Sequence, residues 1–222
     1  VLLKIKNMKQ RDIWNSENIF HMKSDITRIS KIIYQYEIYK KITNISGDII
    51  ECGVFKGNSL IRFLTYREYL DQKYSRKIYG FDVFGKFPKA KNTKDKIFLK
   101  KWEKAAGDGI SQKELKDNLL RKKFENFELV KGDVTKTLPK FLKKNPKLKI
   151  SLLHLDMDIY EPTKFVLFRL FNKISRGGVI LLDDYDKVYG ATKAVDEFLK
   201  FHKSLKIKRK NKFGSTPYII KN

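Results

Sequence analysis

Cysteine is almost absent from this chain, since Cys52 is the single example among 222 residues. This scarcity excludes a disulfide-stabilised scaffold and any cysteine-rich zinc module. Long apolar runs are also missing, and no stretch approaches the roughly 18 residues that a membrane span needs. The apolar start at residues 1–3 is far too short for the core of a secretory leader. We therefore expect a soluble, cytoplasmic protein with no membrane partner.

Acidic residues are scarce relative to basic ones, 25 against 49, which gives a net charge of +24. Such an excess is typical of nucleic-acid-binding proteins. However, only 9 of the basic residues are Arg, the side chain that binds phosphates and bases bidentately. The Lys residues are scattered rather than gathered in one stripe with exposed aromatics. We therefore attribute the basic excess to the general composition of the chain rather than to nucleic-acid binding. The densest basic stretches, 86–149 and 200–212, could still attract an anionic substrate.

Hydrophobic residues make up 41% of the chain, enough for one sizeable core. Apolar runs alternate with segments of helical periodicity, which predicts βαβ units. The expected strands are 48–52, 77–81, 127–131, 149–155, 179–182, 205–210 and 217–220, with Arg176-Gly177-Gly178 turning the chain into the fifth. The expected helices are 25–42, 58–69, 94–106, 111–123, 135–144, 161–174 and 191–202.

This alternation predicts an α/β fold with a mostly parallel twisted sheet and helices on both faces. We expect a helical N-terminal extension over residues 1–45 and one domain over 46–222. In such sheets, ligands bind beyond the carboxyl ends of the strands. The residues at those ends therefore carry the functional prediction.

The first strand ends in an acidic residue and a glycine-bearing loop: Glu51, then Gly53 and Gly57, with Ser59 at the start of a helix. Glycines and a free helix N-terminus suit a nucleotide-type ligand. The spacing is neither that of a dinucleotide fingerprint nor that of a P-loop. A carboxylate would repel a pyrophosphate but attract a cationic amino-acid group, which points to S-adenosylmethionine. An ordinary strand–helix turn is the alternative.

The next two strands also end in acidic residues. Asp82 follows the second strand, where a carboxylate can accept hydrogen bonds from ribose hydroxyls. Asp133 follows the third strand and could accept a hydrogen bond from an adenine amine. A surface-turn acid is the plain alternative for each, but three acids at three successive strand ends favour a site.

Acid pairs follow the fourth and fifth strands, Asp156 with Asp158 and Asp183 with Asp184. Neighbouring parallel strands would bring these carboxylates to one edge, where they repel unless a cation lies among them. Oxygen ligands favour Mg²⁺. His154, two residues before Asp156, is expected to be a buried, hydrogen-bonded strand residue rather than a catalytic one.

Several motifs together resemble the macrocin O-methyltransferase (TylF/MycF-like) family over about residues 46–200. They are Glu51-Cys52-Gly53-Val54-Phe55-Lys56-Gly57, Gly80-Phe81-Asp82 with Gly85 and Phe87-Pro88, Lys131-Gly132-Asp133 with Thr137-Leu138-Pro139, Leu155-Asp156-x-Asp158-x-Tyr160-Glu161-x-Thr163, and Gly177-Gly178 followed by Asp183-Asp184-Tyr185. The resemblance implies a class I methyltransferase Rossmann-like fold, S-adenosylmethionine as donor, bound Mg²⁺ and methylation of a sugar hydroxyl. By motif, Asp156, Asp183 and Asp184 correspond to the metal-and-base acids.

The residues at the strand ends predict S-adenosylmethionine and Mg²⁺, and the resemblance implies an O-methyltransferase that acts on a sugar-containing small molecule. Asp156, Asp183 and Asp184 would hold the metal, with Asp156 as the preferred base. The remaining predicted residues bind the donor: Glu51, Gly53, Gly57, Ser59, Asp82 and Asp133. The Lys-rich segment 86–126 could be a lid or a solvated pair of surface helices. A nucleic-acid methyltransferase, a non-catalytic binding protein of the same fold, and self-association as a homo-oligomer are left open.

Overall fold

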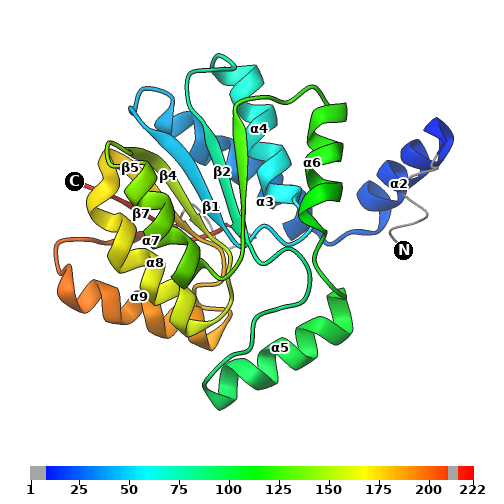
Figure 1. Cartoon of the computed structure of the whole chain (residues 1–222). Coiled ribbons are helices and arrows are strands. Elements are labelled where there is room, and N and C mark those ends of the chain that lie inside the picture. The colour runs from blue at the N-terminus through cyan, green and yellow to red at the C-terminus, as the bar shows by residue number, and fades with distance from the viewer. Residues whose placement is uncertain (1–8, 210–214) are drawn as a thin grey trace.

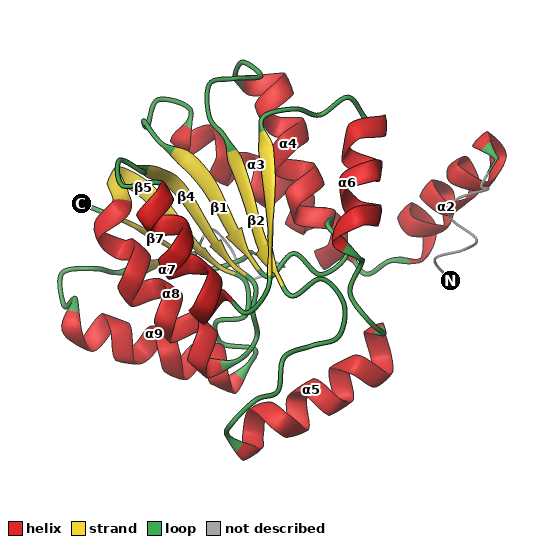
Figure 2. Ribbon diagram, in the orientation of Figure 1, coloured by secondary structure: helices red, strands yellow, loops and turns green. Residues whose placement is uncertain are grey.

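The structure is a computed structural model that describes residues 9–209 and 215–222. One sheet forms its middle layer (Figure 2), with the strand order β3-β2-β1-β4-β5-β7-β6. The strands are β1 Asp48–Cys52, β2 Ile78–Asp82, β3 Phe127–Lys131, β4 Ile150–Leu155, β5 Ile174–Leu182, β6 Ile207–Lys208 and β7 Tyr218–Ile220. Strands β1 to β5 pair in parallel, whereas β7 runs antiparallel to both β5 and β6. The predicted mostly parallel α/β sheet is confirmed.

Helices cover both faces of the sheet (Figure 1). One layer contains α3 Ile26–Ile42, α4 Asn58–Leu70 and α6 Gln112–Arg121, and the other contains α7 Val134–Lys144, α8 Tyr160–Leu170 and α9 Tyr189–Phe201. Successive strand residues alternate between the two layers, so Ile49 packs in one core cluster and Ile50 in the other. Both faces of the central strands are buried, so β4 and the second half of β5 are largely apolar, whereas the edge strand β3 carries Glu128 and Lys131.

Two helices lie apart from these layers (Figure 1): α2 Gln10–Lys23 and α5 Thr93–Ala106. Within the described structure α2 has no buried residue, and it leaves Trp14 and Met22 60% and 80% exposed. The predicted N-terminal extension is thus helical from Gln10, but α3 packs on the sheet as part of the core. Residues 1–8 of that extension, and residues 210–212 of the second basic stretch, lie outside the described residues. Among those that are described, no helix combines the length and apolarity needed to cross a membrane.

The predicted start of the fifth strand was wrong. Gly177 and Gly178 do not precede β5 but lie within it, since the strand begins at Ile174. Ile150 pairs with Ile174 and Leu152 with Val179, so the chain bulges between these pairs. The glycines mark this bulge, as glycine within a strand often does. Helix α8 consequently ends at Leu170, and a 3₁₀ turn spans Phe171–Lys173.

The sheet has one topological switch point, between β1 and β4. The chain proceeds outward from β1 through β2 to β3, and then returns to the other side of β1 to form β4 and β5. Ligands of open α/β sheets bind in the crevice outside the carboxyl ends of the strands at such a point. In this protein that point lies where β1 ends at Cys52 and β4 ends at Leu155.

Candidate active site

The glycine loop after β1 is packed directly against the end of β4. Gly53 has a φ of 91°, and a Cβ added there would lie 1.7 Å from the carbonyl oxygen of Asp156. The Asp156 N–H in turn donates to Cys52 O at 2.9 Å. Gly57 has a φ of 84° and caps the N-terminus of α4. Two predicted glycines therefore adopt left-handed backbone conformations, and one of them joins the predicted donor loop to the predicted base.

Glu51 and Ser59 are brought together beneath this loop. The Ser59 hydroxyl donates to Glu51 Oε1, and His154 Nδ1 lies 3.1 Å from the same oxygen. Both Glu51 and His154 are fully buried. Among the described residues Glu51 Oε2 has no hydrogen-bond partner. A buried carboxylate oxygen without a partner is costly, so this oxygen is available to a bound cationic group.

Asp82 ends β2 and organises two loops. Its Oδ2 accepts hydrogen bonds from the N–H groups of Val54 and Phe55 at 2.7 and 2.9 Å, and its Oδ1 accepts from Phe84 N–H at 2.6 Å. A carboxylate offers about four lone-pair sites, so capacity for one further donor remains. Asp82 can therefore both hold the glycine loop and accept a ribose hydroxyl.

Asp133 is an exposed helix cap. Its Oδ1 accepts from the N–H and the hydroxyl of Thr135 at 2.9 and 2.7 Å, as the N-cap residue of α7. This contact accounts for Asp133 without a ligand. Its role toward adenine stays a prediction.

The predicted metal acids converge at the ends of β4 and β5, which pair in parallel. Ligand atoms of Asp156, Asp183 and His154 lie within 4.8 Å of one another. Asp184 is adjacent but turned to a different contact, since its Oδ2 accepts from the Asp158 N–H at 2.9 Å. His154 is buried and hydrogen-bonded as expected, yet its Nε2 also lies 3.9 Å from Asp183 Oδ1. The structure thus adds a histidine to the acidic edge.

Sequence reasoning missed two residues at this edge. The Lys31 ammonium group, from α3, lies 2.6 Å from Asp183 Oδ2 and 4.0 Å from Asp156 Oδ2. The Thr216 hydroxyl, near the C-terminus, lies 3.3 Å from Asp183 Oδ1. Neither residue belongs to a motif, so no local signal distinguishes Lys31 from the other lysines.

Too little positive charge lies near these four acids for all of them to be ionised at once. Burial and repulsion by Asp183 raise the pKa of Asp156 to about 6. Burial and repulsion by Asp156 raise the pKa of Asp158 to about 7, and burial with repulsion by Asp158 raises the pKa of Asp184 as well. Burial also opposes ionisation of Asp183, but His154 and Lys31 hold the pKa of that carboxyl below its usual range.

A divalent cation fits this edge. Its carboxylate oxygens are the hard ligands that Mg²⁺ prefers, and the raised pKa values indicate a shortage of positive charge. Asp183 already pairs with one cation, the Lys31 ammonium group. Asp156 and Asp183 are therefore placed to hold a metal, with Asp184 beside them.

The predicted lid segment divides into two parts. Helix α6 belongs to a helical layer, with Leu115 and Leu119 fully buried, whereas α5 lies apart from both layers (Figure 1). The Gly109 N–H donates to Gly85 O at 3.0 Å. The two ends of the segment 86–108 are therefore close together in space. The lid therefore stays a prediction for residues 86–108, and α6 is excluded from it because it packs in the core.

Asp95 attaches this segment to the body of the protein. It is fully buried, and its Oδ2 accepts from the Tyr160 N–H, at the start of α8, at 2.9 Å. The same oxygen accepts from Asn92 Nδ2 at 2.7 Å. A small apolar cluster supports the contact, made of Ala90, Leu99 and Ile159.

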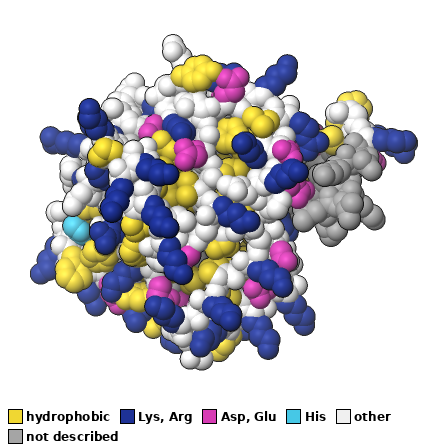
Figure 3. All heavy atoms as spheres, in the orientation of Figure 1, with side chains coloured by type: hydrophobic (Ala, Val, Ile, Leu, Met, Phe, Trp, Pro, Cys, Tyr) yellow, Lys and Arg dark blue, Asp and Glu magenta, His cyan; other side chains and the backbone are white. Residues whose placement is uncertain are grey.

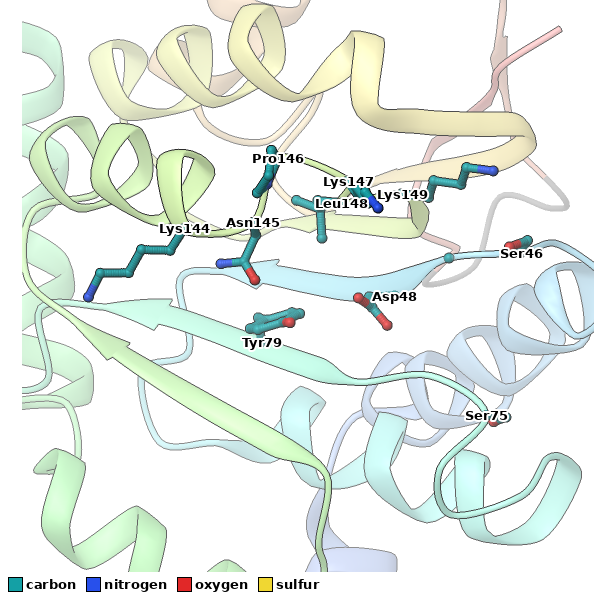
Figure 4. A pocket seen from close by; sticks show the side chains of 11 residues that line it. Ser46, Asp48, Ser75, Tyr79, Lys144, Asn145, Pro146, Lys147, Leu148 and Lys149 are labelled. Atoms are coloured by element: carbon teal, nitrogen blue, oxygen red, sulfur yellow. The ribbon is translucent and has the colours of Figure 1, made fainter.

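An open hollow of about 530 Å³ lies at the opposite end of the sheet. Figure 4 shows Asp48 at the start of β1 and Tyr79 of β2 on one side, with Lys144, Asn145 and Lys147 across from them. Because it adjoins the amino ends of the strands, this hollow is separate from the predicted site.

Solved structures share the fold over nearly the whole chain. Calicheamicin methyltransferase CalS11 superposes with a TM-score of 0.72 at 23% identity, covering 99% of this chain and 89% of that one. The O-methyltransferase NovP gives 0.70 at 22% identity, covering 89% and 80%. An O-methyltransferase from Bacillus cereus in complex with SAH gives 0.53 at 10% identity, covering 96% and 91%. The fold is that of the class I S-adenosylmethionine-dependent methyltransferases.

The sequence comparison is more specific. The family model of macrocin O-methyltransferase (TylF) matches residues 28–209, so the chain belongs to this family. Demethyldecarbamoylnovobiocin O-methyltransferase of Streptomyces niveus is 27% identical over 159 residues, 70% of this chain. The 8-demethyl-8-(2,3-dimethoxy-alpha-L-rhamnosyl)-tetracenomycin-C 4'-O-methyltransferase of Streptomyces olivaceus is 25% identical over 173 residues, 76% of this chain. The matched regions span 59% and 64% of these relatives.

Replacement of Asp82 by Ala should weaken donor binding by about 1.5–3 kcal/mol, the scale of lost hydrogen bonds to a charged group. The loss combines the ribose acceptor with the support that Asp82 gives to the glycine loop. Titration calorimetry with S-adenosylmethionine measures it, with the exposed Asp117→Ala on α6 as the control. Wild-type affinity in Asp82→Ala would remove this residue from the donor site.

Replacement of Asp95 by Ala should loosen residues 86–108. Because Asp95 joins α5 to the start of α8, amide hydrogen exchange within α5 should accelerate by roughly tenfold or more. Asp108→Ala, at an exposed position of the same segment, should leave exchange unchanged. Equal exchange rates in wild type and Asp95→Ala would show that the segment is held by other contacts.

Proposed function

We propose that this protein transfers a methyl group from S-adenosylmethionine to a hydroxyl of a sugar or sugar-containing small molecule, with Mg²⁺ bound at the acidic edge. One observation carries the proposal: the glycine loop meets Asp156 in direct backbone contact. A donor bound at this loop would present its methyl group beside the acids. The name of the Streptomyces olivaceus relative, a 4'-O-methyltransferase of a rhamnosyl-tetracenomycin, supports the acceptor class.

The donor half of the site lies along β1 and β2. Asp82 would accept the ribose hydroxyls, and Glu51 with the Gly53 loop and Ser59 would hold the methionine end. Asp133, at the end of β3, would face the adenine. When bound, the donor supplies an activated methyl group, and Mg²⁺ lowers the pKa of the acceptor hydroxyl and orients it.

Asp156 is the preferred general base. Its side chain is 28% exposed against 10% for Asp183, so an acceptor reaches it more readily. As the hydroxyl oxygen bonds to the methyl carbon and the sulfur–carbon bond breaks, Asp156 would take the hydroxyl proton. Asp183 would hold the metal together with Asp156, with Asp184 beside them, and so keep the acceptor in position for this in-line transfer.

A screen of nucleotide-linked and phosphorylated sugars tests the proposal, with methyl incorporation measured in Mg²⁺ and in EDTA. Incorporation into a sugar that requires Mg²⁺ would support both the acceptor class and the metal. Incorporation into RNA with full activity in EDTA would favour the nucleic-acid alternative. Failure to bind S-adenosylmethionine in calorimetry would favour a non-catalytic binding protein.

Nonspecific DNA binding should be weak at physiological salt. The net charge of +24 favours the opposite, but on the face in Figure 3 the basic side chains are spread among acidic and apolar ones rather than forming a band. Fluorescence anisotropy over a salt series measures the affinity. Submicromolar binding with a steep log-log salt dependence would instead indicate a nucleic-acid substrate.

A further inference from the structure

A lysine from the N-terminal part of the chain occupies the acidic edge. Lys31 belongs to α3, and its ammonium group lies 2.6 Å from Asp183 Oδ2. The same group is 4.0 Å from Asp156 Oδ2. It therefore bridges the ends of β4 and β5, where the proposed function places a divalent cation.

Asp183 has basic side chains on two sides. Its Oδ2 faces Lys31, and its Oδ1 lies 3.9 Å from His154 Nε2. Asp184, by contrast, accepts a hydrogen bond at 2.9 Å from the backbone N–H of Asp158. A metal ligand cannot keep a close ammonium partner on the oxygen that binds the metal, because the two cations repel.

Lys31 is the cation that can leave. Its side chain is 23% exposed, whereas His154 is fully buried within β4. A lysine ammonium sits at the end of a flexible four-carbon stem and is strongly hydrated. It can swing toward water while the stem stays packed. The histidine has no such freedom.

We propose that Lys31 is the resident counter-ion of the Asp156–Asp183 pair and that a divalent cation displaces its ammonium group when it binds. The inference rests on the proposed function only in placing a divalent cation at these two acids. Lys31 then stabilises the metal-free protein and lowers its affinity for the metal. Metal binding also releases a mobile positive charge at the mouth of the site.

Titration calorimetry of the full chain with MgCl₂ and no donor tests the competition. Lys31→Met removes the charge and keeps most of the apolar stem. It should bind Mg²⁺ about tenfold more tightly or better, the scale of a charge-assisted hydrogen bond that no longer has to be broken. Lys41→Met, at an exposed position on the same helix, is the matched control for the loss of one positive charge and should bind as wild type.

Amine labelling of the wild-type protein provides a second measurement that needs no variant. Trace acetic anhydride followed by mass spectrometry reports the reactivity of each lysine. Lys31 should be labelled slowly without Mg²⁺ and several times faster at saturating Mg²⁺. The labelling of Lys41 should not change.

Two results would overturn the inference: Mg²⁺ affinity in Lys31→Met equal to or weaker than in wild type, or Lys31 labelling that Mg²⁺ does not increase. If the wild type still binds Mg²⁺ and methylates a sugar in that case, the proposed function survives alone. If the wild type binds no Mg²⁺ and transfers methyl groups in EDTA, the metal assignment falls together with the inference.

Discussion

Asp183→Asn should reduce turnover by two or more orders of magnitude, a loss of about 3 kcal/mol in transition-state stabilisation, with donor affinity nearly unchanged. The amide keeps the shape of the carboxylate but removes the charge that faces Lys31 and His154. It also removes one of the two acids best placed to hold a metal. The donor half of the site, along β1 and β2, is untouched.

The same substitution should lower the free energy of unfolding by about 1–3 kcal/mol, since a buried charge-assisted hydrogen bond is weakened. Urea unfolding measures this effect separately from turnover. The control is Asp186→Asn, at an exposed position three residues later, where the acid pairs with Arg209. EDTA should abolish wild-type activity and Mg²⁺ should restore it. Full activity in EDTA, or a fully active Asp183→Asn, would refute the metal assignment.

Gly53→Ala should be the most damaging of the small substitutions. The added Cβ would lie 1.7 Å from the Asp156 carbonyl oxygen, so the end of β1 must move away from the end of β4. Because that oxygen belongs to the backbone, no side chain can swing aside. We expect a loss of about 3 kcal/mol or more in stability, which combines left-handed strain with overpacking. Methyl transfer should be lost as well, since Asp156 is displaced.

Gly107→Ala provides the matched control. Gly107 also has a positive φ, 69°, but no described atom lies within 4 Å of a Cβ added there. Gly107→Ala should therefore lose only the energy of backbone strain, about 1–3 kcal/mol, because a φ of 69° with a ψ of −170° is largely restricted to glycine. Thermal and urea unfolding of the two variants measure the difference. Equal losses would mean that the contact between Gly53 and Asp156 is not tight in solution.

The strands and the acids at their ends could be predicted because each depends on a local pattern. The strand Phe127–Lys131 was predicted with its observed bounds. Asp82 and Asp156 follow predicted strands, and the parallel sheet brings them to one edge. The bulge in β5 was not predictable. A Gly-Gly pair such as Gly177-Gly178 looks the same in sequence whether it ends a strand or forms a bulge within one.

Contacts between distant segments could not be predicted at all. Lys31 meets Asp183 across 152 positions of sequence, and only the packing of α3 on the sheet brings them together. Helix α2 lies within the predicted helical extension, but its bounds were not predicted. The cytoplasmic location, the self-association and the anionic acceptor stay predictions.

The hydrogen bond between Gly109 and Gly85 has a consequence for how this protein could diversify. Residues 86–108 begin and end at neighbouring points. The entropic cost of closing such a loop rises only slowly with its length. An insertion or exchange within them would leave the register of β2 and β3 undisturbed. Grafting another sequence between these two glycines should therefore leave the sheet in place.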